Sequence, residues 1–177
     1  MLDRDGTIIE ECEYLSAPQQ IILIPGAGEA LRKLTGMGFG LAVFTNQPAI
    51  GIGFFGDKRL GEIHDCLFQL LRSESVKLDG LYYCPHKPED ACLCREPEVG
   101  LIKKTSRELD FDLERSIVIG DKNSNIEMGR RARATTFLVR TGDGVQMAAA
   151  GKIFADYIVD DLAAAVEIIG PLVRRER

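Results

Sequence analysis

Short apolar runs alternate with amphipathic stretches along this chain, and that alternation restricts its fold more than any other feature. Short, continuously apolar runs are typical of strands buried on both faces of a parallel sheet. We predict strands at LAVFT (41–45), LYYC (81–84), SIVIG (116–120), TTFLV (135–139) and YIV (157–159). Strands that alternate with helices favour an α/β fold, here a Rossmann-like parallel sheet with helices on both faces.

The stretches between these runs carry apolar residues at helical spacing. The predicted helices cover residues 27–34, 60–71 with Asp57 as the preceding N-cap, 99–109, 126–132 and 162–169. No repeat, low-complexity tract or linker interrupts the 177 residues. We therefore expect a single domain over 1–177, without a large inserted cap domain.

Composition and charge narrow the classes of function. The content of 45% hydrophobic and 28% charged residues is ordinary for a globular protein. The net charge of -5 argues against a general nucleic-acid-binding protein, which would carry a basic surface. We find no apolar run that could span a bilayer and no signal peptide. We expect a cytoplasmic protein with reduced thiols, in which Cys12 and Cys66 have no special role.

Polar residues follow the predicted strands at the edge where parallel sheets bind ligands. Asp3 and Asp5 are two residues apart, so they point the same way from an extended strand end. Asp121 follows the run SIVIG and would join them. Three crowded carboxylates are unfavourable unless a hard cation neutralises them, and Mg²⁺ is their usual partner. The alternative for DRDGT alone is a surface turn, because Asp-Gly is a common turn pair.

Four possible metal ligands gather in residues 84–94, which form a polar loop. The three thiols and one imidazole, from Cys84, His86, Cys92 and Cys94, suit tetrahedral Zn²⁺. Such a loop has no apolar core of its own, so a metal would hold it together. Four protein ligands leave no open position, which predicts a structural zinc. The alternatives are reduced surface cysteines, or redox catalysis, which normally uses a Cys-x-x-Cys spacing that is absent.

The motifs DRDGT, TNQ and IGDK, in this order, resemble those of the haloacid dehalogenase superfamily of phosphotransferases. The zinc-type cluster, with GEALRKL and LVRTG, is similar to the heptose-bisphosphate phosphatases and their histidinol-phosphate phosphatase relatives. The resemblance spans residues 3–161. It implies a Mg²⁺-dependent phosphomonoester hydrolase that acts through an aspartyl-phosphate. The substrate it implies is D-glycero-D-manno-heptose 1,7-bisphosphate, which would lose its 7-phosphate in the synthesis of nucleotide-activated heptose.

The resemblance also implies a role for each residue at the strand ends. Asp3 would be the nucleophile, and Asp5 the general acid and then the general base. Asp3, Asp121 and the backbone carbonyl of Asp5 would hold Mg²⁺. The phosphoryl group and substrate would be bound by Thr45, Asn46, Arg95 and Lys122. The zinc loop would carry Arg95 toward the substrate.

The chain departs from the resemblance at four positions. Glu96 stands where the family has a lysine, Ile52 where a basic residue is common, and Ile9 where an asparagine is usual. Asn125 replaces the second acid of the last motif. These changes remove positive charge and add negative charge where a phosphate must bind. Either Glu96 turns outward, or the enzyme is slow and Glu96→Lys raises turnover; we favour the second.

Two alternative functions remain open at this point. The same chemistry could serve histidinol phosphate or another small metabolite. A catalytically weak paralogue could bind a sugar phosphate or a partner protein without turnover, and Glu96 is the best evidence for it. In the favoured case we expect a monomer that acts on a small phosphorylated sugar.

Two further expectations concern single positions. His64 lies within an amphipathic stretch and is predicted to be a surface histidine rather than a ligand. Asp3 follows only two apolar residues, so a strand ending there has almost no body. We expect either a stub strand or a natural start several apolar residues upstream, which would make the chain more stable.

Overall fold

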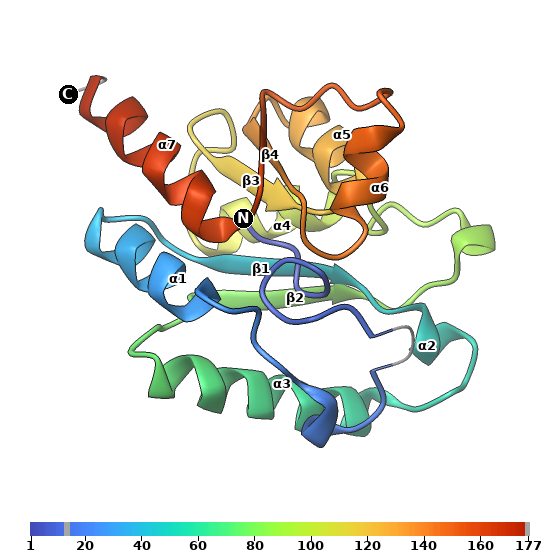
Figure 1. The fold of residues 1–177 in the computed structure, drawn as a ribbon. Coiled ribbons are helices and arrows are strands. Elements are labelled where there is room, and N and C mark those ends of the chain that lie inside the picture. Colours follow the sequence, from blue (N-terminus) through green and yellow to red (C-terminus); the bar gives the residue numbers. More distant parts are fainter. Residues whose placement is uncertain (13–14, 176–177) are drawn as a thin grey trace.

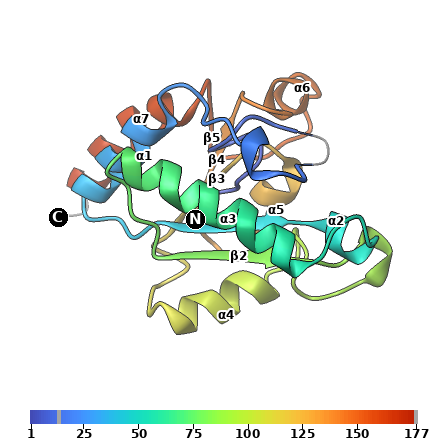
Figure 2. The same cartoon turned by 90° about the horizontal axis from the view of Figure 1, so that it is seen from below.

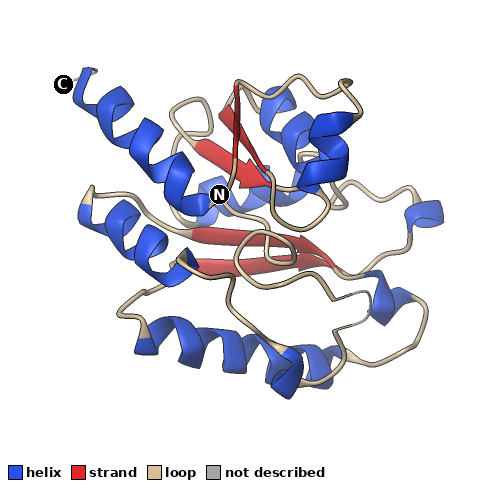
Figure 3. Cartoon of the chain, viewed as in Figure 1, coloured by secondary structure: helices blue, strands red, loops and turns tan. Residues whose placement is uncertain are grey.

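The computed structural model describes residues 1–12 and 15–175, and it shows a parallel sheet with flanking helices (Figure 1, Figure 3). The strands are β1 (Ala42–Asn46), β2 (Gly80–Cys84), β3 (Ile117–Gly120), β4 (Thr135–Val139) and β5 (Tyr157–Val159). Strand β1 pairs with β2, β3 with β4, and β4 with β5, each in parallel. All the predicted strands are confirmed to within one residue at either end.

The first residues of the chain join the two groups of strands into one sheet (Figure 1). Leu2 forms parallel bridges to both β1 and β3. Its N–H donates to the Ala42 carbonyl at 2.9 Å, and its own carbonyl accepts the Phe44 N–H at 2.8 Å. On the other side, the Asp3 N–H donates to the Ile119 carbonyl at 3.0 Å. The expected stub strand therefore lies between β1 and β3, at the centre of the sheet.

Helices cover both faces of the sheet (Figure 2). The longer ones are α1 (Ala27–Gly36), α3 (Asp57–Ser73), α4 (Gly100–Glu108), α5 (Asn123–Arg131) and α7 (Leu162–Arg175). Val43 of β1 belongs to the core that contains α1, α3 and α7, whereas its neighbour Phe44 packs with α4 and α5. The predicted two-sided α/β arrangement is confirmed. None of the helices in the described residues is both long and apolar enough to cross a membrane.

Four short helical elements were not predicted from the sequence, because each is too short to show a periodic pattern. They are η1 (Pro18–Gln20), α2 (Pro48–Gly51), η2 (Pro88–Asp90) and α6 (Gly144–Ala149). The predicted N-cap of α3 is wrong by one residue. Gly56 is the N-cap, and Asp57 is the first helical residue, where it accepts a hydrogen bond from the Tyr83 hydroxyl at 2.9 Å. A carboxylate in the first turn still interacts favourably with the helix dipole.

A hollow of about 530 Å³ lies at the starts of β1 and β3. Its lining includes Met1, Phe39, Phe111 and Ile117. It is at the amino ends of the strands, opposite to the edge that carries the acidic motifs. The expectation of additional apolar residues upstream stays a prediction.

The central position of Leu2 gives a first prediction, for the variant Leu2→Ala. Leu2 is 2% exposed, so its truncation removes buried apolar surface and leaves a cavity between β1 and β3. We expect the free energy of unfolding to fall by about 2–5 kcal/mol. The matched control is Leu93→Ala, because Leu93 is 77% exposed and its truncation should cost less than about 0.5 kcal/mol. Urea denaturation of both variants measures the difference, and equal midpoints would contradict the central role of Leu2.

Candidate active site

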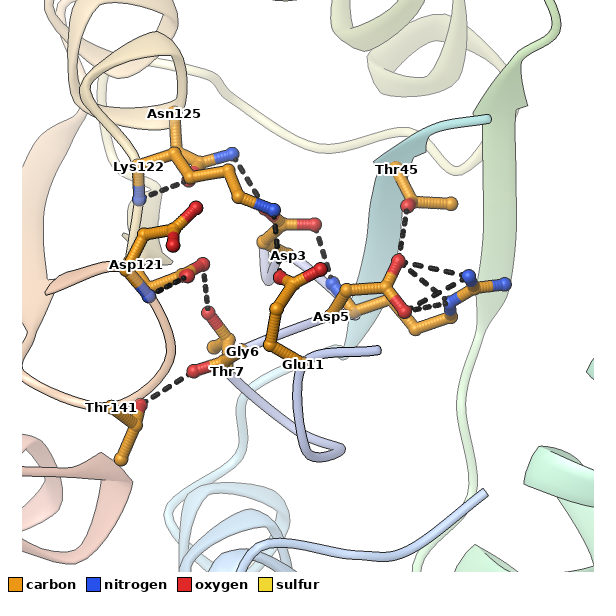
Figure 4. Close-up of polar contacts among 12 residues, drawn as sticks. Asp3, Asp5, Gly6, Thr7, Glu11, Thr45, Asp121, Lys122, Asn125 and Thr141 are labelled. Atoms are coloured by element: carbon orange, nitrogen blue, oxygen red, sulfur yellow. Dashed lines mark hydrogen bonds and ion pairs between the residues drawn. The ribbon is translucent and has the colours of Figure 1, made fainter. Parts of the chain in front are cut away.

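The predicted acidic residues meet at the carboxyl ends of the central strands (Figure 4). Asp3 and Asp5 follow the stub strand, Thr45 ends β1, and Asp121 and Lys122 follow β3. Asp3, Asp5, Thr45 and Asp121 are all buried. Because these strands are parallel and adjacent, residues from distant parts of the sequence converge on one edge.

Both carboxylate oxygens of Asp3 accept a hydrogen bond. The Arg4 N–H donates to Oδ1 at 2.6 Å, and the side-chain amide of Asn125 donates to Oδ2 at 2.9 Å. These two donors fix the plane of the carboxylate. Burial raises the pKa of Asp3 well above its usual value, and the nearby carboxylates of Glu96 and Asp121 raise it further.

Asp121 is held by the loops on either side of it. The Thr7 hydroxyl donates to Oδ1 at 3.3 Å, and the Asp143 N–H donates to Oδ2 at 3.0 Å. Gly6 passes so close that a Cβ there would lie 2.2 Å from Asp121 Oδ2, and its φ of +73° also favours glycine. Burial raises the pKa of Asp121 to about 6.

Among the described residues Asp3 and Asp121 form no ion pair, because Arg4 pairs with Asp5 and Lys122 with Glu11. Lys122 Nζ lies 2.8 Å from Glu11 Oε2 (Figure 4). Burial works against the charge of Lys122, but Asp3, Glu11 and Asp121 outweigh it and raise the pKa of the ammonium. The carboxylate oxygens of Asp3 and Asp121 are buried, and they need a nearby positive charge to stay ionised. This chemistry fits Mg²⁺, a hard cation that prefers carboxylate ligands.

Two further acids, Glu11 and Asp143, lie beside Asp121 and were not predicted from the sequence. Carboxylate oxygens of Glu11, Asp121 and Asp143 lie within 4.8 Å of one another. Glu11 comes from the loop after the first motif, and Asp143 from the loop that precedes α6. Neither lies in a motif or a periodic segment, so the sequence carries no signal for this contact.

Asp5 is tightly paired with the residue that precedes it. The Arg4 guanidinium donates to both oxygens of Asp5, with Nη2 at 2.8 Å from Oδ2 and Nε at 3.2 Å from Oδ1. The Thr45 hydroxyl and the Gln47 amide also donate to Oδ2, at 3.3 and 3.1 Å. In this arrangement Asp5 is a carboxylate that accepts hydrogen bonds. To protonate a leaving group, its side chain must turn away from Arg4.

The prediction that His64 is a surface residue is wrong. His64 is buried on α3, and its Nε2 lies 3.1 Å from Arg4 Nη1. Burial, followed by the positive charge of Arg4, lowers the pKa of His64 to about 3. The imidazole is therefore neutral and accepts a hydrogen bond from Arg4. The signal was present in the sequence, because His64 is four residues after the buried Leu60 and shares its helical face.

The remaining predicted phosphate-binding residues lie around this centre. The Arg95 guanidinium donates to the His86 carbonyl at 3.2 Å and stays on the cysteine-containing loop. The side chain of Asn46 accepts the Glu96 N–H at 3.2 Å, a contact that the sequence did not indicate. Asn46 thus ties the end of β1 to the segment after that loop.

Glu96 does not turn outward, so that alternative is wrong. It is 6% exposed, and its Oε2 accepts a hydrogen bond from the Asn125 amide at 2.6 Å. Burial raises the pKa of Glu96 to about 7, although the Asn125 hydrogen bond and the charge of Lys122 oppose this. A carboxyl group is therefore part of the site at the position where the resemblance implied a lysine.

The four predicted zinc ligands converge. The sulfur atoms of Cys84, Cys92 and Cys94 lie 3.2–3.5 Å from one another, and His86 Nδ1 lies 3.2 Å from the Cys94 sulfur. These thiols are free cysteines. Burial raises the pKa of Cys84 to about 12, whereas hydrogen bonds outweigh burial at Cys92 and lower its pKa to about 7. Three thiols and one imidazole nitrogen around one point fit a closed tetrahedral zinc site.

The fold and the acidic strand ends define a hydrolase of the haloacid dehalogenase class. The family model described as HAD-hyrolase-like matches residues 93–165. A crystal structure of the D,D-heptose 1,7-bisphosphate phosphatase from B. bronchiseptica, complexed with magnesium and phosphate, superimposes with a TM-score of 0.90. That protein is 31% identical, and the match covers 97% of each chain.

Curated relatives place the chain within that class. It is 37% identical to the probable D-glycero-D-manno-heptose-1,7-bisphosphate 7-phosphatase of Thermoplasma volcanium, over 78% of this chain and 96% of the relative. It is 34% identical to the D-glycero-beta-D-manno-heptose-1,7-bisphosphate 7-phosphatase of Haemophilus influenzae, over 95% and 94%. The chain belongs to the heptose-bisphosphate phosphatase family of haloacid dehalogenase-like hydrolases.

The raised pKa values of Glu96 and Asp121 predict how stability depends on pH. Both carboxyls have a higher pKa in the folded state, about 7 and about 6, than in the unfolded chain. Their stabilising contribution is therefore complete below about pH 4 and is lost as the pH rises to about 7. For a group shifted as far as Glu96 the loss is on the order of 3 kcal/mol.

Thermal unfolding in a chelator should therefore show a Tm that falls between about pH 5 and about pH 7.5. Mg²⁺ should raise Tm more at the higher pH, because it binds the ionised carboxylates. The variant Glu96→Gln cannot titrate at this position and should flatten the profile in chelator. A Tm in chelator that does not fall over this range, for the unmodified protein, would contradict the assignment.

Proposed function

We propose that this protein is a Mg²⁺-dependent phosphomonoester hydrolase that removes the 7-phosphate of D-glycero-D-manno-heptose 1,7-bisphosphate. The observation that carries the proposal is the pair of buried carboxylates, Asp3 and Asp121, at adjacent strand ends in a member of this family. Both stay without an ion pair to Arg4 or Lys122, as expected of metal-binding carboxylates. The product would enter the synthesis of nucleotide-activated heptose.

In this proposal Asp3 attacks the phosphorus atom and forms an aspartyl-phosphate while the alkoxide leaves. The two donors on its carboxylate hold it in one orientation. Asp3, Asp121 and the Asp5 carbonyl would hold Mg²⁺, which screens the charge of the phosphoryl group when bound. Thr45, Asn46, Arg95 and Lys122 would bind phosphoryl oxygens or substrate.

Asp5 would protonate the leaving alkoxide and then accept a proton from the attacking water. Both of its oxygens accept hydrogen bonds from the Arg4 guanidinium. The first step requires release from Arg4. We infer that Arg4, itself held by His64, keeps the Asp5 side chain in place until it turns toward a bound substrate and takes up from solvent the proton that it gives to the alkoxide.

The zinc loop would have a structural task. With four ligands from Cys84, His86, Cys92 and Cys94, Zn²⁺ would hold residues 84–94 and place Arg95 beside the site. We also infer a cytoplasmic, monomeric enzyme, in which reduced thiols remain available to the metal.

A phosphate-release screen tests the function. Its substrates are the heptose 1,7-bisphosphate, histidinol phosphate and p-nitrophenyl phosphate, each with and without Mg²⁺. We expect the heptose bisphosphate to give the highest kcat/KM and activity to vanish in chelator. Preference for histidinol phosphate would contradict the proposed substrate. No turnover on any of the three would favour a binding protein.

The nucleophile is tested by Asp3→Asn. The amide is uncharged and a poor nucleophile, so turnover should fall by at least about 10³-fold. The control is Asp65→Asn, the same change at an exposed position on α3, which should keep full activity. Near-normal turnover of folded Asp3→Asn protein would exclude the proposed mechanism.

The zinc loop gives a separate prediction. Protein purified without added metal should contain one zinc per chain by elemental analysis. Cys92→Ser should lower the zinc content and raise KM, because the loop loosens. It should lower Tm only slightly, because the core remains intact. Cys12→Ser makes the same change outside the cluster and should leave the zinc content intact. Zinc-free protein with normal KM would contradict the structural role.

A further inference from the structure

One side-chain amide connects two carboxylates at the centre of the site. Asn125 Nδ2 donates to Asp3 Oδ2 at 2.9 Å and to Glu96 Oε2 at 2.6 Å. Asn125 is 1% exposed, so no bulk solvent competes for these bonds. Glu96 and Asn125 are therefore in direct contact with each other, and Asn125 is also in direct contact with Asp3, the proposed nucleophile.

The amide of Asn125 has one orientation that satisfies all its neighbours. Its oxygen accepts the Lys122 N–H at 2.9 Å, at the start of α5. Its nitrogen has two hydrogens, and one carboxylate lies near each. A rotated amide would turn its oxygen toward both carboxylates and lose the bond to Lys122. Glu96 thus contributes to the orientation of the group that orients Asp3.

Glu96 is itself held in place from the opposite side. Its N–H donates to the Asn46 side chain, and Asn46 ends β1. The other carboxylate oxygen, Oε1, is buried and has no hydrogen-bond partner among the described residues. A buried oxygen without a partner is retained at a cost in stability, as is common at functional sites.

We propose that Glu96 is a positioning residue for the nucleophile, that it acts through Asn125, and that positions 96 and 125 form one coupled unit. The inference rests on the proposed phosphatase function. Glu96 holds the Asn125 amide, and the amide holds the Asp3 carboxylate in the plane set by the Arg4 N–H. In this pair Asn125 is the donor and Glu96 the acceptor, so the identity of one residue determines which residue fits at the other position.

The coupling reverses the expectation that the sequence alone favoured for Glu96→Lys. A lysine at position 96 would direct hydrogen-bond donors at an amide nitrogen that is also a donor. Asn125→Asp alone would place another carboxylate against Asp3 and Glu96. Each single change therefore leaves two donors or two acceptors facing each other. In the double variant the ammonium at position 96 would face both the new carboxylate at position 125 and Asp3, and would replace the amide as the donor that orients Asp3.

The test is a double-mutant cycle of E96K, N125D and E96K/N125D with p-nitrophenyl phosphate and Mg²⁺. Each single variant should lose about 10- to 100-fold in kcat, and the double variant should return to within about 5-fold of the parent. Losses that simply multiply in the double variant would overturn the coupling. Thermal unfolding of all four proteins identifies a variant that fails to fold.

A second pair of variants separates positioning from a merely structural role. Glu96→Gln keeps an oxygen that can accept from Asn125, and it should retain kcat within about 3-fold of the parent. Glu96→Ala removes that acceptor and should lower kcat by about 10-fold or more, with KM changed less than about 3-fold, because orientation rather than binding is lost. Equal kcat for Glu96→Ala and the parent would overturn the proposal.

Activity of the parent enzyme on the heptose bisphosphate distinguishes a failure of the proposed function from a failure of the proposed coupling. If the parent enzyme hydrolyses p-nitrophenyl phosphate but not the heptose bisphosphate, the proposed substrate is wrong. The double-mutant cycle then still tests the coupling. An additive cycle in an enzyme that does hydrolyse the heptose bisphosphate overturns the coupling alone. A parent inactive on both substrates overturns the phosphatase function and the positioning role together.

Discussion

Hydrogen bonds from the first three residues to the strands on either side hold the sheet together and set the geometry of the site. In the described part of the chain β1 and β3 do not pair directly; the sheet is continuous because Leu2 bridges both. The same segment sets the position of Asp3, whose N–H bonds to Ile119, two residues before Asp121. Core packing and the spacing of the two acids therefore depend on the same short segment.

Burial of so many acids at one edge is costly unless each has a partner. Arg4 forms an ion pair with Asp5 and Lys122 with Glu11, so Lys122 offsets the charges of Asp3 and Asp121 only in part. A divalent cation would relieve this imbalance, which explains why an otherwise unfavourable set of carboxylates can be maintained. The cation that the proposed reaction requires would thus also balance these charges.

The parts of this site that follow from local pattern could be predicted from the sequence. The strands appear as short apolar runs, and Asp3, Thr45 and Asp121 follow from the rule that parallel strands bind ligands at their carboxyl ends. The contacts between Arg4 and His64 and between Glu96 and Asn125 could not be predicted. Each joins side chains from elements that are far apart in the sequence, and only the packing of α3 against the sheet, or of the cysteine loop beside α5, brings them together.

The cysteine loop and the nucleophile are connected by a short chain of contacts. Cys94 belongs to the four-ligand cluster, and Glu96 is two residues further along. The Glu96 N–H is fixed by Asn46 and its carboxylate by Asn125, which bonds Asp3. A displacement of the loop must therefore move Glu96 or break one of these bonds. A metal in the loop that takes no part in the reaction would therefore still affect the orientation of Asp3, the proposed nucleophile, because Glu96 links the loop to Asn125 and Asp3.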